Sequence, residues 1–542
     1  MARLESDYVQ PAGEANTAAG GTPFRLEDSI GGIWSGKPIF GQDQVIAQLD
    51  TGLEIGGKTI TFGFLDGPHT IGQYNKPGAH SEPAGYAPLT DAQKDAVRAS
   101  MVLWDDLIAP SVAEKNGNGA DIMVANTTTT GPAAAWAYYP DPDQGTGHEV
   151  ASDVWVVNPA TLPPNGAVDP GQFGSYTLIH ELGHAFGLSH PGPYDAAADT
   201  DGDGVPDPIS YEYSAVYAQD TRQYTVMSYF EDDSSGGGQT WNVSTANTTM
   251  PQTPLIHDIL AIQAKYGADP ATRADDTVYF ANSTAGNAVY DLARNPFPYL
   301  AVYDAGGNDT FDFSTANGGV FIDLRPGSFS SASQGYLPLD QANAAIEAQP
   351  GHPQGWWTAD SYPGWVDFVT SQVEGRVEGD TGIAGITATS FDNVSIAYNT
   401  VIENAIGGAA RDYLVGNDVA NILKGNGGDD VLNGLAGDDQ LWGGDGADEF
   451  RFSDHSGNDT IKDFVSGTDR INLADIDADT STAGDQAFAF VGTAAFTGTA
   501  GELQLYTSHG EQYLAGDVDG NGVADFAIGI GAAWVIQGDL VL

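Results

Sequence analysis

Apolar residues in the first half of the chain follow helix spacing in some segments and strand spacing in others. A helix is predicted where apolar side chains recur every three or four positions, at Val97, Met101, Trp104 and Ile108. The capping box Thr90-Asp91-Ala92-Gln93 marks the start of that helix. The segments ADIMVAN and SDVWVVN, with Ala135–Tyr138 between them, predict strands. We therefore expect an α+β domain over residues 36–268, in which this helix packs on a sheet.

In the second half the pattern changes to a nine-residue repeat that begins at Gly407. Its copies read GGAARDYLV, GNDVANILK, GNGGDDVLN, GLAGDDQLW and GGDGADEFR. The sixth position holds Asp412, Asn421, Asp430, Asp439 and Asp448, and the eighth is always apolar, at Leu414, Leu423, Leu432, Leu441 and Phe450. This pattern predicts an all-β parallel β-roll, in which glycine turns hold the Asp residues against calcium and the apolar side chains face inward. A glycine-rich linker would not keep the apolar residue in phase. Because Asn421 replaces Asp and the first repeats lack several glycines, not every turn need bind calcium.

Acidic residues outnumber basic ones by 73 to 19, which gives a formal net charge of −54. Such a chain repels itself unless cations bind, so divalent cations are favoured partners, whereas nucleic acids and anionic membranes are not. The chain contains no cysteine, which excludes disulfides, cysteine-ligated zinc and thiol catalysis. No run of about 18 apolar residues predicts a membrane span, and the amino terminus lacks the apolar core of a signal peptide. Residues 1–35 are small and polar and are predicted to be a flexible leader or a pro-segment.

The residues HELGHAFGLSH, from His180 to His190, have the spacing of a catalytic zinc site. On a helix, His180 and His184 leave the same face, and Glu181 lies beside them as a general base for water at the metal. Gly187 can adopt a left-handed conformation that ends the helix and returns His190 to the same ion. Three protein ligands leave one position for water, as in catalytic rather than structural zinc sites. The pattern HExxH alone arises by chance in helices, but the glycine and the third histidine at their required offsets favour zinc.

Downstream, the segment YTVMSYF places Met227 and Tyr229 in a context that resembles the metzincin metalloproteases. In that superfamily a Met-containing turn lies beneath the zinc histidines, and in its serralysin branch a tyrosine two residues later is a movable zinc ligand. The resemblance implies that Tyr229 is such a ligand with a role in catalysis; otherwise both are ordinary packing residues. Ala135–Tyr138 resembles the serralysin sheet edge that pairs with extended substrates, although an edge strand protected by loops is the alternative. Ile256–Gly267 resembles the helix that closes the serralysin catalytic domain, and His257 within it is predicted to be structural.

The second half resembles serralysins beyond the repeats, in the segments TRADDTVY, DAGGNDTFDFS, VIENAIGG and FSDHSGNDTIKDF. By this resemblance one calcium would be held by Arg273, Asp275, Thr277, Asp304, Gly306 and Asp309, and Glu403 would ligate a second. Asp275 stands where serralysins commonly have Gly, which a backbone-carbonyl ligand would tolerate. The terminal DLVL also matches the family, whose carboxy-terminal region is read by a type I secretion machinery. The chain would then leave the cell unfolded and fold outside on binding calcium.

Two further acidic segments predict calcium sites. Asp199, Asp201, Asp203 and Asp207 resemble the first part of an EF-hand loop without its twelfth-position Glu, and a solvated acidic turn is the alternative. Near the end of the chain, Asp517, Asp519, Asn521 and Asp525 form a similar pattern.

Between about residues 334 and 392 the chain carries a segment that is longer than serralysins usually have there, with Trp356, Trp357 and Trp365. It is either a packing flap over the roll or a surface for a partner. Packing is favoured because aromatic side chains are mostly buried.

Together these patterns predict a secreted, monomeric zinc endopeptidase of the serralysin type. A metzincin domain would occupy residues 36–268, and a calcium-binding β-roll or β-sandwich domain residues 269–542. Its partners would be extended polypeptide substrates and the type I secretion machinery. The alternative is a calcium-dependent surface or adhesion protein with a vestigial protease domain, since such repeats occur on many non-proteases. The complete set of zinc-site residues favours the protease.

Overall fold

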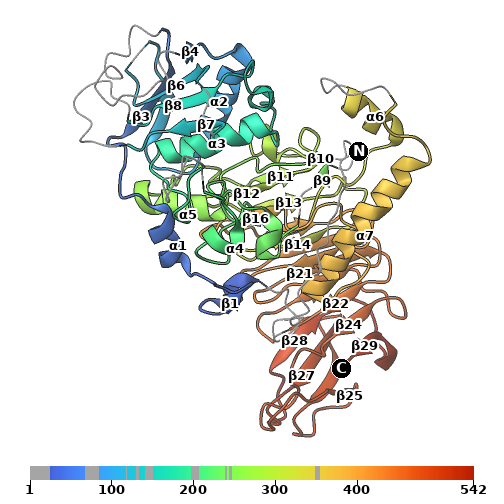
Figure 1. Ribbon diagram of the computed structural model, residues 1–542. Helices are drawn as coiled ribbons and strands as arrows, with labels where there is room; N and C mark the ends of the chain where they lie inside the picture. Colours follow the sequence, from blue (N-terminus) through green and yellow to red (C-terminus); the bar gives the residue numbers. More distant parts are fainter. Residues whose placement is uncertain are drawn as a thin grey trace.

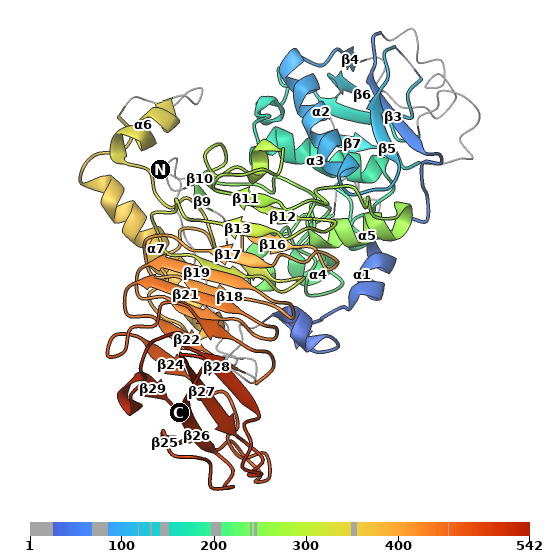
Figure 2. The same cartoon turned by 180° about the vertical axis from the view of Figure 1, so that it is seen from behind.

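The computed structural model describes residues 25–67, 85–117, 119–129, 133–140, 151–196, 207–238, 241–242, 247–347, 355–453 and 455–542. The described chain is elongated, with a mixed helix and sheet region at one end and the carboxy-terminal strands at the other (Figure 1). Seen from behind, short strands stack in the middle of the molecule (Figure 2). Every helix among the described residues is too short or too polar to cross a bilayer.

The N-terminal half contains a six-stranded sheet in the order β5-β3-β6-β8-β7, with β4 paired to β6. These strands are β3 (Thr59–Phe64), β4 (Tyr86–Ala87), β5 (Ser111–Glu114), β6 (Ile122–Thr127), β7 (Ala135–Ala137) and β8 (Val154–Val157). The helices of this half are α1 (Gln42–Leu49), α2 (Asp91–Asp105), α3 (Phe173–Ala185), α4 (Tyr211–Ser214) and α5 (Ile256–Tyr266). The pairings are parallel except at β4 and β7. Helix α2 shares one apolar core with the sheet, as predicted.

Helix α2 begins at the predicted capping box. The Gln93 backbone N–H donates to Thr90 Oγ1 at 3.2 Å, and the Thr90 N–H donates to Gln93 Oε1 at 3.1 Å. The four apolar residues that predicted the helix are all buried, at Val97, Met101, Trp104 and Ile108. The helix ends at Asp105, so Ile108 enters the core from the following turn.

The C-terminal half is built mainly from two sheets whose repeat strands run parallel. One has the order β11-β13-β17-β19-β21-β23-β28-β27-β26-β25, and the other β14-β18-β20-β22-β24-β29. Ile422 pairs with Gln440 and Tyr413 with Val431, which are offsets of 18 residues, so two nonapeptides make one coil. The eighth-position residues of the repeats are fully buried, as predicted, at Leu414, Leu423, Leu432, Leu441 and Phe450.

The bounds of these strands are β11 (Val278–Phe280), β13 (Thr310–Asp312), β14 (Phe321–Asp323), β17 (Asn404–Ile406), β18 (Tyr413–Val415), β19 (Ile422–Gly427), β20 (Val431–Asn433), β21 (Gln440–Asp445), β22 (Glu449–Arg451), β23 (Thr460–Ile461), β24 (Arg470–Asn472), β25 (Ala489–Gly492), β26 (Glu502–Ser508), β27 (Glu511–Asp517), β28 (Phe526–Gly529) and β29 (Leu540–Val541). A smaller sheet holds β12 (Leu300–Val302), β15 (Phe329–Ser330) and β16 (Val394–Ile396). Two hairpins are β1 (Ile33–Trp34) with β2 (Lys37–Pro38), and β9 (Trp241–Asn242) with β10 (Asn247–Thr248). Short 3₁₀ turns are η1 (Leu26–Ser29), η6 (Pro163–Gly166), η7 (Asp232–Ser235), η8 (Ala288–Tyr290) and η9 (Gln537–Asp539).

The Trp-containing segment forms two helices, α6 (Leu339–Glu347) and α7 (Ser361–Thr381). In both views α7 runs along the side of the roll, and α6 lies beyond its far end (Figures 1 and 2). The lower part of α7 packs on the roll, where Val369, Val373 and Val377 share a cluster with Phe321 and Tyr413. This agrees with the packing alternative for α7.

The tryptophans of the segment differ in environment. The rings of Trp365 and Trp241 lie 5.3 Å apart, which links α7 to the β9–β10 hairpin. Trp357 belongs to a small cluster with α6, whereas Trp356 is 47% exposed. Packing therefore accounts for two of the three tryptophans.

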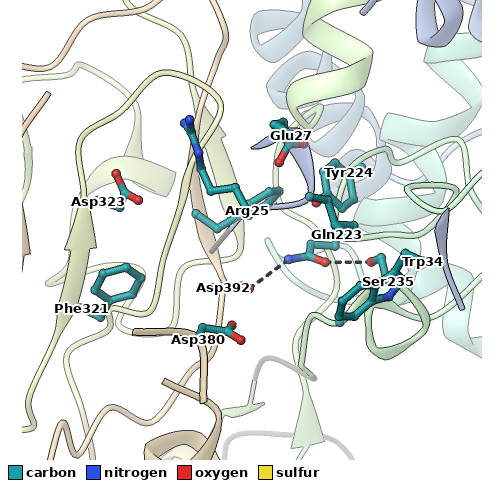
Figure 3. Close-up of a pocket in the computed structure, with 13 residues that line it drawn as sticks. Arg25, Glu27, Trp34, Gln223, Tyr224, Ser235, Phe321, Asp323, Asp380 and Asp392 are labelled. Carbon is teal, nitrogen blue, oxygen red and sulfur yellow. Dashed lines mark hydrogen bonds between the residues drawn. The ribbon is translucent and has the colours of Figure 1, made fainter. Parts of the chain in front are cut away.

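The last part of the predicted leader is packed against the rest of the chain. Leu26 is buried, and Arg25 Nη1 donates to Ser328 Oγ in the roll at 3.0 Å. Next to this segment lies a cavity of about 60 Å³, shown in Figure 3, where the chain before β1, the loop around Gln223 and the roll meet. Residues 25–35 therefore lie between the two halves of the molecule and contact both.

Candidate metal centre

Helix α3 presents His180 and His184 on one face and ends before Gly187. Gly187 has a φ of +95°, the left-handed conformation predicted for it. A Cβ atom at this position would also lie 2.2 Å from the Leu53 carbonyl oxygen, so only glycine fits. The chain turns here and returns His190 toward the helix, which brings three imidazoles together.

The three imidazoles converge through their Nε2 atoms. Nε2 of His190 lies 3.1 Å from Nε2 of His184 and 3.4 Å from Nε2 of His180. Nitrogen ligands at about 2.0–2.1 Å from a tetrahedral zinc are themselves about 3.3–3.4 Å apart. The spacing of the described side chains thus suits one such ion.

Backbone carbonyls orient all three rings. His180 Nδ1 donates to Val226 O at 2.7 Å, and the Nδ1 atoms of His184 and His190 donate to Leu188 O and Tyr194 O, both at 2.8 Å. Because a carbonyl oxygen only accepts, each ring carries its proton on Nδ1 and turns the lone pair of Nε2 toward the centre. Burial is the main cause that lowers the pKa of each histidine to about 3, and the charge of a neighbouring imidazole adds a smaller effect in the same direction. Three neutral imidazoles therefore face one point, which is the donor set of a metal site.

Glu181 is buried beside the histidines. Among the described residues its Oε2 atom has no hydrogen-bond partner. Burial, with a smaller contribution from the charge of Asp195, raises the pKa of Glu181 to about 8. A nearby cation would lower that pKa again. The structure therefore places Glu181 beside the imidazole cluster, and its role as the general base stays a prediction.

The Met-containing turn lies against α3. Met227 is fully buried, and a Cβ atom at Gly183 would lie 2.5 Å from its sulfur atom. The ring of Tyr229 lies 4.5 Å from the ring of His190 and 5.8 Å from that of His180, measured between centroids. The structure therefore brings Tyr229 to the imidazole cluster, and its role as a ligand stays a prediction.

Residues that sequence reasoning missed also surround the centre. Asp258 in α5 accepts from the Val226 N–H at 2.7 Å and from Thr225 Oγ1 at 2.5 Å, which fixes the turn whose carbonyl holds His180. Tyr139, beyond the edge strand β7, places its ring 5.6 Å from that of His184. No spacing rule signals these contacts, because the partners lie far apart in the sequence. His257, predicted to be structural, is buried among tyrosine rings.

Comparison with known proteins gives close relatives over most of the chain. It is 35% identical over 549 residues to the metallopeptidase AprA of Pseudomonas marginalis, with 97% of each chain covered. It is 36% identical to a serralysin of Photorhabdus laumondii, covering 82% of this chain and 76% of the relative. The chain belongs to the serralysin family of metalloproteases. It is also 32% identical to serralysin B of Dickeya chrysanthemi, covering 70% of this chain and 65% of the relative.

The sequence family described as Peptidase M10 serralysin C terminal matches residues 268–337 and 381–542. Helices α6 and α7 lie between the two matched ranges. The helical pair of this chain is therefore an addition to the family's C-terminal pattern, within the range of about 334–392 predicted from the sequence.

The fold brings together the first predicted calcium group. Thr277 N–H donates to Asp309 Oδ1 at 2.8 Å, and Asp309 N–H donates to Glu403 Oε2 at 2.7 Å. Thr277 Oγ1 donates to the Asp275 carbonyl at 2.8 Å, and Gly306 N–H to Asp304 Oδ1 at 2.9 Å. Glu403, predicted for a second site, thus lies beside the first group.

The carboxyl groups of this cluster are buried or partly buried close to one another. Burial, together with the charges of Asp304 and Glu403, raises the pKa of Asp309 to about 7. The Arg273 guanidinium cannot serve as a ligand, because it donates to Tyr303 O and to Asp106 Oδ2, both at 2.7 Å. Only the backbone of Arg273 is left for the predicted role.

The repeat carboxylates form two ladders that run from coil to coil. On one side Asp412 N–H donates to Asp430 Oδ1, and Asp430 N–H to Asp448 Oδ1, at 2.8 and 3.0 Å. On the other side Asn421 N–H donates to Asp439 Oδ1 at 2.8 Å. The Oδ2 atoms of Asp430 and Asp448 are buried and lack a hydrogen-bond partner in the described chain. Buried anionic oxygens of this kind are suited to calcium.

Both ladders extend one step beyond the predicted residues. Asp448 N–H donates to Asp469 Oδ1 at 3.2 Å, and Asp439 N–H to Asp459 Oδ1 at 3.1 Å. The sequence offsets are 21 and 20 residues rather than 18, so a strict nine-residue phase missed them. The motif Gly-x-Asp, present in both segments, was the available signal.

The last predicted group lies in the loop between β27 and β28. Carboxylate oxygens of Asp517, Asp519 and Asp525 lie within 4.8 Å of one another. The Asn521 N–H donates to Asp519 Oδ1 at 2.9 Å, so this residue shapes the same loop. Of the EF-hand-like group, Asp207 is partly buried, whereas Asp199, Asp201 and Asp203 lie outside the described residues.

Proposed function

We propose that this protein is a secreted zinc-dependent endopeptidase that hydrolyses peptide bonds in extracellular proteins. The observation that carries the proposal is the convergence of three neutral imidazoles, in which His190 Nε2 lies within 3.4 Å of both other Nε2 atoms. Lone pairs at this separation repel each other unless they share a cation. Three imidazoles with one position left for water are the donor set of catalytic zinc.

The side chains around the histidines have the chemistry that peptide hydrolysis requires. Bound zinc would lower the pKa of water and polarise the substrate carbonyl. Glu181, whose buried Oε2 has no partner among the described residues, takes the proton from the attacking water and passes it to the leaving amine. Tyr229 would serve as a displaceable fourth protein ligand, and its hydroxyl could donate a hydrogen bond to the developing oxyanion once it leaves the metal.

The edge of the sheet is proposed to hold the substrate. Strand β7 pairs only with β8 among the described strands, so its outer main-chain groups face away from the sheet. An extended polypeptide can add there as a further strand through backbone hydrogen bonds, which recognise main chain rather than side chains.

Calcium is proposed to be structural and to couple folding to export. The ladders of buried carboxylates are destabilised by their own charge until calcium binds. The monomeric chain would therefore pass the type I secretion machinery unfolded and fold outside the cell, where binding of calcium to the native state stabilises it.

Metal content and casein hydrolysis, each with and without a chelator, test the proposal. The purified chain should contain zinc and cleave casein. Glu181→Gln should keep its zinc and lose about 10²–10⁴-fold in kcat, whereas the control Glu231→Gln, which alters an exposed carboxylate, should stay active. Full activity of Glu181→Gln would contradict the assignment of the base. A parent chain that folds with calcium but lacks proteolysis would instead be the adhesion protein with a vestigial protease domain.

A further inference from the structure

One buried carboxylate joins two segments of the metal centre. Asp220 is fully buried, and its Oδ1 atom accepts hydrogen bonds from the hydroxyls of Tyr194 at 2.7 Å and Ser228 at 2.8 Å. Tyr194 follows the third histidine in the chain, and Ser228 lies between Met227 and Tyr229. A single oxygen atom therefore contacts both loops that flank the imidazole cluster.

The first of these contacts supports His190. The Tyr194 carbonyl accepts from His190 Nδ1 at 2.8 Å, and the two rings stack with centroids 5.3 Å apart and an interplanar angle of 14°. The backbone of Tyr194 thus sets the tautomer of His190, and its ring sets the plane of the imidazole. The hydrogen bond to Asp220 fixes the far end of the tyrosine.

The second contact supports the turn that carries Tyr229. Ser228 Oγ donates to Asp220 and accepts from the Phe230 N–H at 3.1 Å, so it fastens the backbone on both sides of Tyr229. The rings of Tyr194 and Tyr229 are 5.3 Å apart. These hydrogen bonds fix the backbone from which the Tyr229 side chain extends.

We propose that Asp220 is a positioning residue of the metal centre, which fixes the loop that supports His190 relative to the turn that carries Tyr229. The inference rests on the proposed zinc-protease function. A purely structural carboxylate would change only the stability of the fold. A positioning residue also changes zinc affinity and kcat in protein that is fully folded.

Single hydroxyl deletions separate the two contacts. Tyr194→Phe keeps the stacked ring and the backbone carbonyl but deletes the hydroxyl that anchors them to Asp220. It should lower zinc affinity about 10-fold, because the groups that orient His190 are then less well fixed. Ser228→Ala should lower kcat about 10-fold at saturating zinc, with KM changed less than about 2-fold, because it loosens a group that acts in the transition state. Asp220→Ala should show both losses, and Asp220→Asn, which keeps an acceptor oxygen in place, should restore most of each. The matched control is Tyr217→Phe. The Tyr217 hydroxyl is buried in the loop that also carries Asp220, and it has no hydrogen-bond partner among the described residues.

Zinc affinity is measured by chelator competition, and kcat and KM with a peptide substrate in calcium. If the proposal holds, Asp220→Ala in the Tyr194→Phe background causes no further loss of zinc affinity. Additive losses, or unchanged zinc affinity and kcat in Tyr194→Phe and Ser228→Ala, overturn it. If Asp220→Ala does not fold, Tyr194→Phe and Ser228→Ala still test the proposal on their own. A parent chain that neither binds zinc nor cleaves peptides overturns the proposed function as well, whereas an active parent with unaffected variants overturns this inference alone.

Discussion

Arg376 of α7 donates a hydrogen bond to the backbone carbonyl of Gly237, which ties the inserted helix to the loop after the Met-containing turn. Gln223 makes a second tie nearby, since it donates to Asp392 Oδ2 at 3.2 Å and accepts from Ser235 Oγ at 2.8 Å (Figure 3). Both contacts join the roll and its insertion to the segment that positions Met227. The helical insertion is thus a brace between the two halves of the molecule.

Removing the brace should destabilise the protein. Arg376→Met keeps an apolar side chain over Phe391 but deletes the charged donor to Gly237. A hydrogen bond from a charged group contributes about 1.5–3 kcal/mol, so we expect the free energy of unfolding to fall by about that amount in calcium. Urea unfolding measures it. The control Ser371→Ala alters an exposed residue of the same helix, and an equal loss in both variants would contradict the brace.

The substitution Gly183→Ala adds one methyl group to α3 and should disturb the metal centre through the Met-containing turn. In Gly183→Ala the new Cβ would lie 2.5 Å from Met227 Sδ and 3.3 Å from Trp104, so the Met-containing turn must shift. Overpacking of this kind costs about 1–3 kcal/mol, and we expect weaker zinc retention during dialysis as well.

Gly375→Ala in α7 is the matched control for this change. Nothing lies within 4 Å of a Cβ at that position, so the same substitution should stabilise its helix by about 0.5–1 kcal/mol. If both variants unfold at the same urea concentration and retain zinc equally, then contact with Met227 does not restrict position 183 to glycine.

Calcium-free protein should lose stability as pH rises. Burial, with smaller effects of neighbouring carboxylates, raises the pKa of Asp309 and Asp430 to about 7 and that of Asp448 to about 6. Between about pH 4 and these values the folded state keeps protons that the unfolded chain releases, so the free energy of unfolding falls with increasing pH. We expect a lower thermal midpoint at about pH 7.5 than at about pH 5 in chelator.

Excess calcium should reverse this trend, because it binds the ionised carboxylates and is displaced by protons. The measurement is a set of thermal melts at both pH values, with chelator and with calcium. A calcium-free midpoint that rises with pH would show that these carboxylates are ionised in the folded state without the ion.

The loop between β27 and β28 should bind one calcium ion of its own. Asp519→Asn removes one of the charges that meet within 4.8 Å there, and should reduce the number of bound ions measured by calorimetry. Asp485→Asn, an exposed aspartate outside the group, is the control. Identical stoichiometry in both variants would refute this site.

Local patterns identified the elements whose partners are close in sequence. The capping box of α2, the glycine that ends α3 and the inward leucines of the roll all depend on neighbouring residues or on a fixed repeat, so spacing alone was informative. The three imidazoles also belong to this group, because His180 and His190 are separated by one helix turn and one loop.

Contacts between distant segments were not predictable in the same way. Asp220 and Asp258 support the metal centre through hydrogen bonds that only the folded chain creates. Helix α7 was missed because Pro363 and three glycines at positions 364, 375 and 379 give it low intrinsic helix propensity. Its valines compensate by packing on the roll, which is tertiary information.

The ladders also give the roll a direction. In these ladders a backbone N–H of one coil donates to an aspartate side chain of the next coil along the chain. Each such turn is therefore held by a residue that lies later in the sequence. Removal of the last coil would therefore leave backbone N–H groups of the coil before it without their acceptors, and trimming the carboxy terminus should destabilise the roll from the cut end.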